Sequence, residues 1–134
     1  MVDNRGKGLF LQGDVGRGKS VIITGIIPVL MYATFSKVLT PYPAEVIPDK
    51  YKQLISAWAV CIDDLGTEPK VNDFGERYEG FPHIANAAEA RLKLMFITTN
   101  LTSEQLLERY GERTVDRIRR LCRIVKFNGK SFRK

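Results

Sequence analysis

The stretch Gly13-Asp14-Val15-Gly16-Arg17-Gly18-Lys19-Ser20 matches the phosphate-loop pattern G-x-x-x-x-G-K-[ST] at every defined position. Glycines in this pattern let successive backbone N–H groups turn inward and cradle phosphate oxygens, where a side chain would block the approach. Lys19 is placed to reach the β- and γ-phosphates, and the Ser20 hydroxyl is placed to ligate Mg²⁺. The sequence therefore predicts that this chain binds a nucleoside triphosphate.

The residues on either side of the loop agree with this prediction. Residues 8–12 are typical of a short buried strand, and the apolar run after Ser20 predicts a helix over residues 19–33, bent near Pro28. This strand–loop–helix context disfavours a chance match in a glycine-rich turn, because it points the positive end of the helix at the anion. The residues expected to contact the nucleotide are Gly13, Asp14, Val15, Gly16, Arg17, Gly18, Lys19, Ser20 and Val21.

Length and composition indicate one globular domain. The chain has 134 residues, of which 44% are hydrophobic and 27% charged, enough for a single core. Cys61 and Cys122 lie in apolar stretches with no recognisable secretory signal ahead of them, so we expect reduced thiols and a cytoplasmic location. The run from Val21 to Ala33 is too short to span a bilayer, so we expect no membrane partner.

Charge is unevenly distributed along the chain. From Arg113 to the end there are nine basic residues and one acid, a net charge of +8, whereas the whole chain carries +6. A basic carboxyl-terminal segment suggests a polyanionic partner, either nucleic acid or the triphosphate of a neighbouring subunit. A solvated charged helix explains the composition equally well.

After the first unit, strand-like and helix-like segments alternate along the chain. We expect strands at 37–42, 57–62, 92–99 and 122–127, helices at 49–56, 82–90, 102–110 and 112–121, a loop at 66–81, and a turn at 128–129. Asp49 and Thr102 are the expected helix caps, the latter in a capping box with Gln105. This alternation predicts an α/β domain with a largely parallel sheet.

The apolar strand 57–62 ends in Asp63-Asp64, which is typical of a Walker B element. Because the carboxyl ends of parallel strands meet at one edge of a sheet, these acids should lie beside the phosphate loop. Asp63 would hold the Mg²⁺ that Ser20 touches, and Asp64 is placed to polarise the attacking water. A plain strand-ending turn before Gly66 is the alternative, and the neighbouring phosphate loop disfavours it.

Three further polar residues are candidates for contacting phosphate. Asn100 follows a buried strand and could orient the water or sense the γ-phosphate, although a simple turn residue fits equally well. Arg113 and Arg117 lie four apart on one helix face, and an arginine from a neighbouring subunit commonly neutralises charge on the transferring phosphoryl group. From the residues alone, ion pairs with Glu112 or Asp116 are the favoured alternative.

Four further blocks follow the phosphate loop in order: CIDDLGTE at 61–68, FITTNL at 96–101, YGERTVDRI at 110–118, and GKSFR at 129–133. Together with the loop they resemble the AAA+ ATPases of the DnaC/IstB group, which are helicase loaders and transposition helper ATPases. The resemblance covers nearly the whole chain.

This resemblance implies an α/β fold with a P-loop NTPase (AAA+) core, in which helices flank a five-stranded sheet of order 5-1-4-3-2. It implies a single ATPase core over residues 1–134, without the amino-terminal partner-binding region and carboxyl-terminal lid of the group. Asn100 would act as sensor 1, and Arg117 as the arginine finger acting in trans, with Arg113 the weaker candidate. Lys19 and Arg117 would together offset the developing negative charge.

The implied function is that of a Mg²⁺-dependent ATPase of helicase-loader type in DNA replication, assembled as a ring or filament with ATP between subunits. Its implied partners are single-stranded DNA and a replicative helicase. Two alternatives stay open: a transposition helper that acts with a transposase on duplex DNA, and a nucleotide-dependent binding switch with little turnover. A small-molecule phosphotransferase is disfavoured because no acceptor-binding lid is visible, and the residues leave the choice between ATP and GTP open.

Two departures from the group bear on this function. Asp64 stands where many AAA+ proteins have Glu, which is compatible with slow hydrolysis. Lys19 and Asp63 are 44 positions apart, fewer than is usual for the group. The shortened stretch lies around residues 40–49, where elements that face DNA would be expected.

Overall fold

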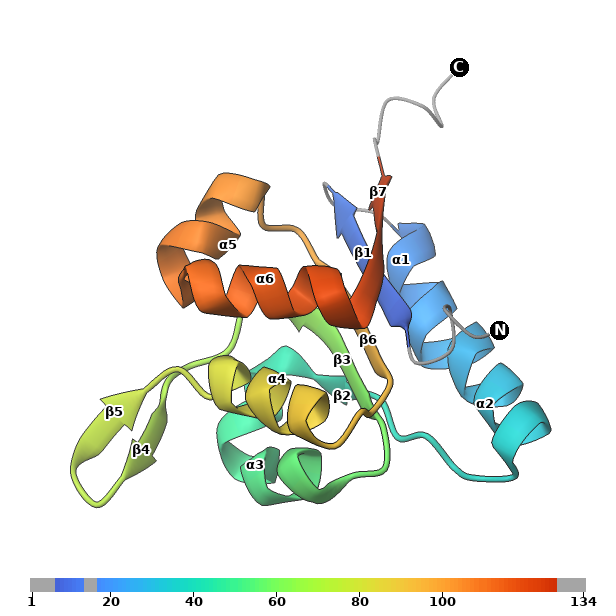
Figure 1. Cartoon of the computed structure of the whole chain (residues 1–134), viewed down its shortest axis with the longest axis horizontal. Coiled ribbons are helices and arrows are strands. Elements are labelled where there is room, and N and C mark those ends of the chain that lie inside the picture. Colours follow the sequence, from blue (N-terminus) through green and yellow to red (C-terminus); the bar gives the residue numbers. More distant parts are fainter. Residues whose placement is uncertain (1–6, 14–16, 128–134) are drawn as a thin grey trace.

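A five-stranded parallel sheet forms the centre of the computed structural model, which describes residues 7–13 and 17–127. The expected turn at 128–129 and the block at 129–133 lie outside this part of the chain. Figure 1 shows the strands, whose spatial order is β2 (Tyr42–Pro43), β3 (Val60–Leu65), β6 (Met95–Thr99), β1 (Gly8–Gly13) and β7 (Cys122–Phe127). Numbered along the chain and read from β7, this is the order 5-1-4-3-2, so the predicted fold class is confirmed.

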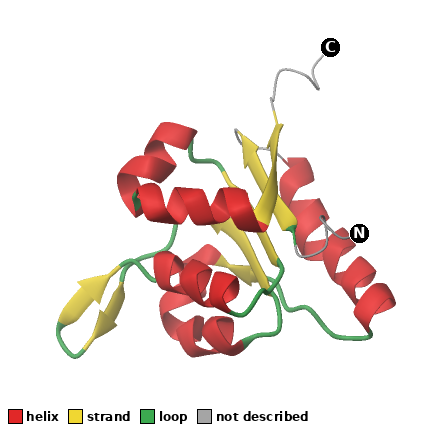
Figure 2. Cartoon of the chain, in the orientation of Figure 1, coloured by secondary structure: helices red, strands yellow, loops and turns green. Residues whose placement is uncertain are grey.

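Helices cover both faces of the sheet, but unequally (Figure 2). One face packs against a continuous helical segment made of α1 (Arg17–Val21), a π-helical turn (Ile22–Ile26) and α2 (Ile27–Phe35). The other face packs against α3 (Ile47–Ser56), α4 (Phe81–Ala90), α5 (Ser103–Tyr110) and α6 (Glu112–Leu121). The larger of the two hydrophobic clusters therefore lies on the α3–α6 face.

Alternation along the central strands supplies both clusters. Phe10 of β1 and Ile62 of β3 are buried on the α3–α6 face, whereas Leu11 and Cys61, their neighbours in sequence, are buried on the α1–α2 face. Successive side chains of a strand point to opposite faces, and a parallel sheet buries both. This explains why the central strands are continuous apolar runs and could be predicted. Burial raises the pKa of the Cys61 thiol to about 12, so this buried thiol stays protonated.

The helix after the phosphate loop is irregular just ahead of Pro28, where a bend was expected. A π-helical turn spans Ile22–Ile26, and the Ile27 N–H donates to the Ile22 carbonyl. Pro28 has no N–H, and in a regular helix its ring would clash with the carbonyl of Thr24. A turn widened by one residue removes this conflict while the helix continues.

This helical segment is more exposed than a core helix normally is. Ile23 and Ile27 are buried against the sheet, but large apolar side chains elsewhere on and just after the segment are open to solvent. These are Val21, Ile26, Val29, Leu30, Tyr32, Phe35 and Val38. The helix Gly18–Phe35 is in fact long and apolar enough to cross a membrane by length and composition, a weak criterion that core helices also meet. Its packing through Ile23 and Ile27 holds it on the sheet.

In the segment after this helix, the expected strand and the expected cap are wrong, whereas the expected helix is present with an earlier start. The strand expected at 37–42 is reduced to β2, where only Tyr42 and Pro43 pair with β3. Pro41 and Pro43 cannot donate to a ladder, so the edge strand stays short. The helix expected from Asp49 begins two residues earlier, at Ile47, because Pro48 fits the first turn; Asp49 lies within that turn and makes no cap.

The segment expected to be a loop at 66–81 contains a hairpin. Its strands are β4 (Val71–Asp73) and β5 (Glu76–Tyr78), and Figure 1 shows the hairpin projecting from the body of the protein. Phe74 and Gly75 form the turn with φ of 51° and 87°. Positive φ at both central residues is the requirement of a type I′ hairpin turn, and Phe is an unusual choice for such a position, so the turn was hard to recognise.

The capping box at the start of α5 is confirmed. The Gln105 N–H donates to the Thr102 hydroxyl at 3.1 Å, and the Thr102 N–H donates to the Gln105 side chain at 2.8 Å. We predict that Thr102→Ala lowers the free energy of unfolding by about 1 kcal/mol, measured by urea denaturation, because an orphan N–H loses its acceptor. Thr102→Ser keeps the hydroxyl and should retain most of this stability. An alanine variant as stable as the serine variant would contradict the role of the cap.

Candidate functional site

The carboxyl end of β3 lies against the start of the helix that follows the phosphate loop. The Ser20 hydroxyl donates to Oδ2 of Asp63 at 2.7 Å, and the Thr98 hydroxyl donates to Oδ1 of the same carboxylate at 2.6 Å. Both carboxylate oxygens of Asp63 therefore accept a hydrogen bond, one from Ser20 on α1 and one from Thr98 on β6. The structure brings the phosphate-loop serine and the first Walker B acid together, as the sequence predicted.

Thr98 is a residue of this site that the sequence reasoning missed. Its hydroxyl also accepts from the Asp64 N–H at 2.7 Å, so it bonds to both acids of the pair. Thr98 is buried near the end of β6, next to Thr99, whose hydroxyl donates to the Leu65 carbonyl. Two consecutive threonines in an otherwise apolar buried strand were the available indication, because buried hydroxyls need partners.

An irregularity in β3 separates the roles of the two acids. The pairing of β3 with β6 shifts between Ile62 and Leu65, and Asp64 adopts a left-handed conformation with φ of 66°. Aspartate tolerates this conformation better than most residues, and such bulges re-aim side chains beside functional sites. As a result Asp63 contacts Ser20 and Thr98, whereas Asp64 is exposed to solvent.

Lys19 is folded onto the phosphate loop. Its side chain is 3% exposed, and Nζ donates to the Gly13 carbonyl at 3.3 Å. Gly13 is required where it stands, because a Cβ there would lie 2.2 Å from the Phe127 carbonyl oxygen. Gly18 and Val21 are exposed in the first turns of the helix. The predicted contacts Asp14, Val15 and Gly16, and the side chain of Arg17, lie outside the described part of the chain.

Asn100 lies at the same edge of the sheet as the loop. It is exposed directly after β6 and lines a pocket of about 200 Å³ together with Gly13. The remaining residues that line this pocket are Gln12, Leu101, Thr102, Ser103, Lys126 and Phe127. The predicted sensor residue is therefore close to the start of the phosphate loop.

A buried polar network holds the chain just after the two acids. The Glu68 carboxylate accepts from the Gly66 N–H at 2.7 Å and from the Tyr110 hydroxyl. Arg109 donates to the Glu68 carbonyl at 2.7 Å and forms an ion pair with Glu79 at 3.1 Å. Burial, and then the hydrogen bond to Glu68, raise the pKa of Tyr110. The network fastens the segment after Asp64 to α5, and the sequence reasoning missed it.

The two candidate finger arginines differ in their surroundings on α6. Arg117 Nε donates to Glu89 of α4 at 2.9 Å, not to Glu112 or Asp116 as the simpler alternative supposed. Arg120 shares the same carboxylate, and these hydrogen bonds lower the pKa of Glu89. Arg113 is exposed and forms no ion pair within residues 7–13 and 17–127. Neither arginine contacts the described residues of the phosphate loop.

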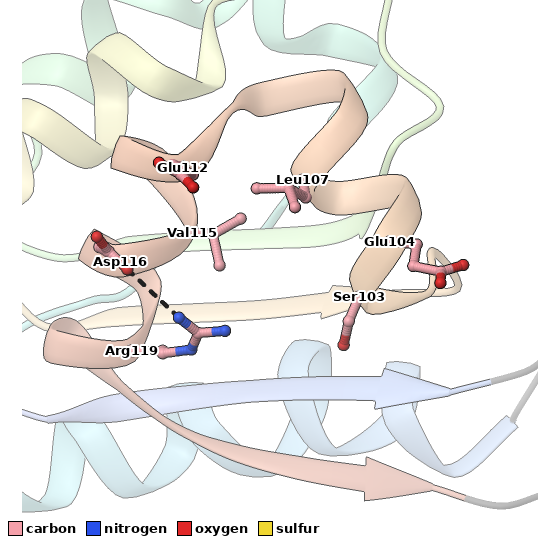
Figure 3. A pocket seen from close by; sticks show the side chains of 7 residues that line it. All are labelled: Ser103, Glu104, Leu107, Glu112, Val115, Asp116 and Arg119. Atoms are coloured by element: carbon pink, nitrogen blue, oxygen red, sulfur yellow. Dashed lines mark hydrogen bonds and ion pairs between the residues drawn. The ribbon is translucent and has the colours of Figure 1, made fainter.

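A second pocket, of about 390 Å³, lies between α5 and α6 (Figure 3). It is lined by Ser103, Glu104, Leu107, Glu112, Val115, Asp116 and Arg119. Three carboxylates and one guanidinium border it, and Arg119 is paired with Asp116 at 3.3 Å. None of the predicted site residues lines this pocket, so we do not assign the nucleotide to it.

The donor set at the Ser20–Asp63 contact fits Mg²⁺. A hydroxyl and a carboxylate are the hard oxygen ligands that Mg²⁺ prefers, and Mg²⁺ in phosphate sites uses only one or two carboxylates with the rest of its shell from water and phosphate. No group of three or more His, Cys, Asp or Glu able to hold a metal occurs among the described residues. The residues present therefore suit a metal carried with a triphosphate.

Comparison with known proteins identifies the fold. The crystal structure of the DnaC helicase loader is 23% identical, with a TM-score of 0.66 over 92% of this chain and 80% of that chain. The crystal structure of DnaI is 21% identical, with a TM-score of 0.58 over 90% of this chain and 72% of that chain. No protein-family model and no curated sequence matches. The chain therefore shares the fold of these two proteins, in which helices flank a five-stranded parallel sheet.

We predict that Thr98→Val lowers the free energy of unfolding by about 1–3 kcal/mol, because the Asp64 N–H and one oxygen of Asp63 lose a buried partner of nearly the same shape. Urea denaturation measures the change. Thr98→Ser is the matched control, since it keeps the hydroxyl and loses only a methyl group. Equal stability of the valine and serine variants would show that these hydrogen bonds contribute nothing.

Proposed function

We propose that this chain is a Mg²⁺-dependent ATPase of helicase-loader type that acts in DNA replication. The observation that carries the proposal is the hydrogen bond between Ser20 and Asp63, which joins the two phosphate-binding elements of a DnaC-like fold. The ordered sequence blocks support it, as does the fact that one of the similar solved structures is that of a helicase loader.

In the proposed reaction, water attacks the γ-phosphate in line. Asp64 is exposed at the end of β3 and polarises the water, while Asn100 orients it from the end of β6. Lys19 leaves the Gly13 carbonyl to bind the β- and γ-phosphates. Ser20 and Asp63 would hold Mg²⁺, which would neutralise charge on the phosphate oxygens. Asp64 in place of glutamate is compatible with a slow rate.

We further propose that the site is completed by a second copy of the chain. Arg117 is the preferred finger and Arg113 the second candidate, because both lie on α6 and neither contacts the described part of its own phosphate loop. Arg117 would exchange its ion pair with Glu89 for the phosphates of a neighbour. ATP would then bind between subunits of a cytoplasmic homo-oligomer, whose basic carboxyl-terminal segment suits single-stranded DNA.

We predict that Asp64→Asn lowers kcat for ATP hydrolysis by about 10²–10⁴-fold while ATP binding is retained, because only the activation of water is lost. Lys19→Ala should weaken ATP binding itself. Steady-state hydrolysis is measured with and without single-stranded DNA. A wild-type rate no higher than that of Asp64→Asn in every condition would refute the enzyme and leave a nucleotide-dependent switch.

We predict that Arg117→Ala and Lys19→Ala subunits, each inactive alone, regain ATPase activity when mixed. Mixed interfaces can then pair an intact loop with an intact finger, and a finger contributes about 10³–10⁵-fold to kcat. Arg113→Ala is mixed in parallel to compare the two candidates. Arg120→Ala is the matched control. Arg120 lies on α6 with Arg117 and also binds Glu89, but it should be dispensable for activity. No recovery in any mixture would refute a finger acting in trans.

We predict that a pull-down retains a replicative helicase in preference to a transposase, because the similar solved structures favour the loader over the transposition helper. The Lys19→Ala variant serves as the nucleotide-free control. Retention of the transposase alone would replace the helicase-loader assignment with the transposition helper, without affecting the ATPase chemistry.

A further inference from the structure

The end of β7 places an aromatic side chain beside the start of the phosphate-loop helix. Phe127 is in register with Gly13, the first residue of the loop, on the neighbouring strand β1. Its Cε2 atom lies 3.8 Å from the position that a Cβ on Gly18 would occupy. The ring is half-buried and packs against the cluster of the α1–α2 face, to which Leu11 and Ile23 belong. Its position is therefore set by the core.

The order of the strands indicates how a bound triphosphate would be oriented at this edge of the sheet. The Ser20–Asp63 contact marks the metal and γ-phosphate side, toward β3. β3 and β7 lie on opposite sides of β1. With its γ-phosphate toward β3 and its middle on the loop after β1, an extended triphosphate leaves its nucleoside on the side of β7. Phe127 is the aromatic residue at the end of that strand.

There is also open space at this end of the sheet. Phe127 lines the pocket of about 200 Å³ that is also lined by Gly13, the first residue of the phosphate loop, and by Asn100, the proposed sensor. The end of β7 therefore borders open space at the end of the sheet where the phosphate loop begins.

We propose that the ring of Phe127 forms the wall against which the base of the bound nucleotide stacks. This inference rests on the proposed function, since it concerns the same nucleotide site, and it assigns the base-binding side that the phosphate loop leaves undefined. A phenyl ring offers a face and no hydrogen-bond donor or acceptor. It can therefore stack on the face of a base but cannot form hydrogen bonds with the edge of the base, as is the case for aromatic side chains that stack on nucleic-acid bases.

This chemistry predicts a particular selectivity. ATP and GTP present similar purine faces and should bind with similar affinity, and a pyrimidine triphosphate should bind more weakly. Inorganic tripolyphosphate has the charge of the nucleotide and no base, so its binding should not depend on Phe127. The comparison of ATP with tripolyphosphate isolates the contribution of the base from that of the phosphate loop.

The test is isothermal titration calorimetry of ATP and of tripolyphosphate, each with Mg²⁺, on the wild type, Phe127→Leu and Phe127→Trp. Leucine keeps apolar volume in the α1–α2 cluster but removes the ring, and tryptophan keeps a ring. The expected result is that Phe127→Leu weakens ATP binding by about fivefold or more, the scale of one stacked base, while tripolyphosphate binding is unchanged. Phe127→Trp should restore ATP binding, and its added fluorescence should be quenched by ATP but not by tripolyphosphate.

Each other outcome contradicts the inference in a recognisable way. Unchanged ATP affinity in Phe127→Leu, with no quenching in Phe127→Trp, shows that the base lies elsewhere. An equal loss for ATP and tripolyphosphate shows that Phe127 only supports the phosphate loop. If the wild type binds neither ligand, the proposed nucleotide site fails as well, whereas the first two outcomes leave it intact.

Discussion

The hydrogen bond between Ser20 and Asp63 is the contact on which the site depends, because it joins segments 43 positions apart in sequence. It forms only if the helix after the loop and the strand β3 end at the same edge of the sheet, which the parallel order β3–β6–β1 ensures. Thr98, from the strand between them, fixes the second oxygen of the carboxylate. Three elements thus converge on one side chain, and each is held there by a strand buried on both faces.

β3 is irregular where it ends, between Ile62 and Leu65. A regular strand would send Asp63 and Asp64 to opposite faces of the sheet. Alternation alone places Asp63 on the face of Cys61 and Ser20, whereas Asp64, in a left-handed conformation, is exposed to solvent instead of joining Ile62 in the α3–α6 cluster. The conformation is supported from both sides: the Asp64 N–H is bonded to Thr98, and the Glu68–Arg109–Tyr110 network fastens the following residues. Local strain of this kind persists where the surroundings fix it.

Several elements could be predicted because their determinants are local. The central strands are apolar runs buried on both faces, and α5 begins at a capping box and ends before Gly111. The predicted secondary structure was wrong where a local pattern of residues had more than one interpretation. Prolines shortened the expected strand at 37–42, Pro48 moved the start of α3 ahead of Asp49, and Phe74 concealed a hairpin turn. Thr98 and Glu68 were missed because their partners, Asp63 and Tyr110, are far away in sequence.

By itself, the sequence determined the phosphate loop, the acidic pair and the order of strands and helices, since these depend on residue type, spacing and hydrophobic periodicity. Only the tertiary structure decided which groups meet. It bound both acids to Thr98, bound Arg117 to Glu89 and set the ring of Phe127 beside Gly18. The reason is physical: contacts between distant segments follow from how the sheet is packed and registered, and no local pattern of residues encodes that arrangement.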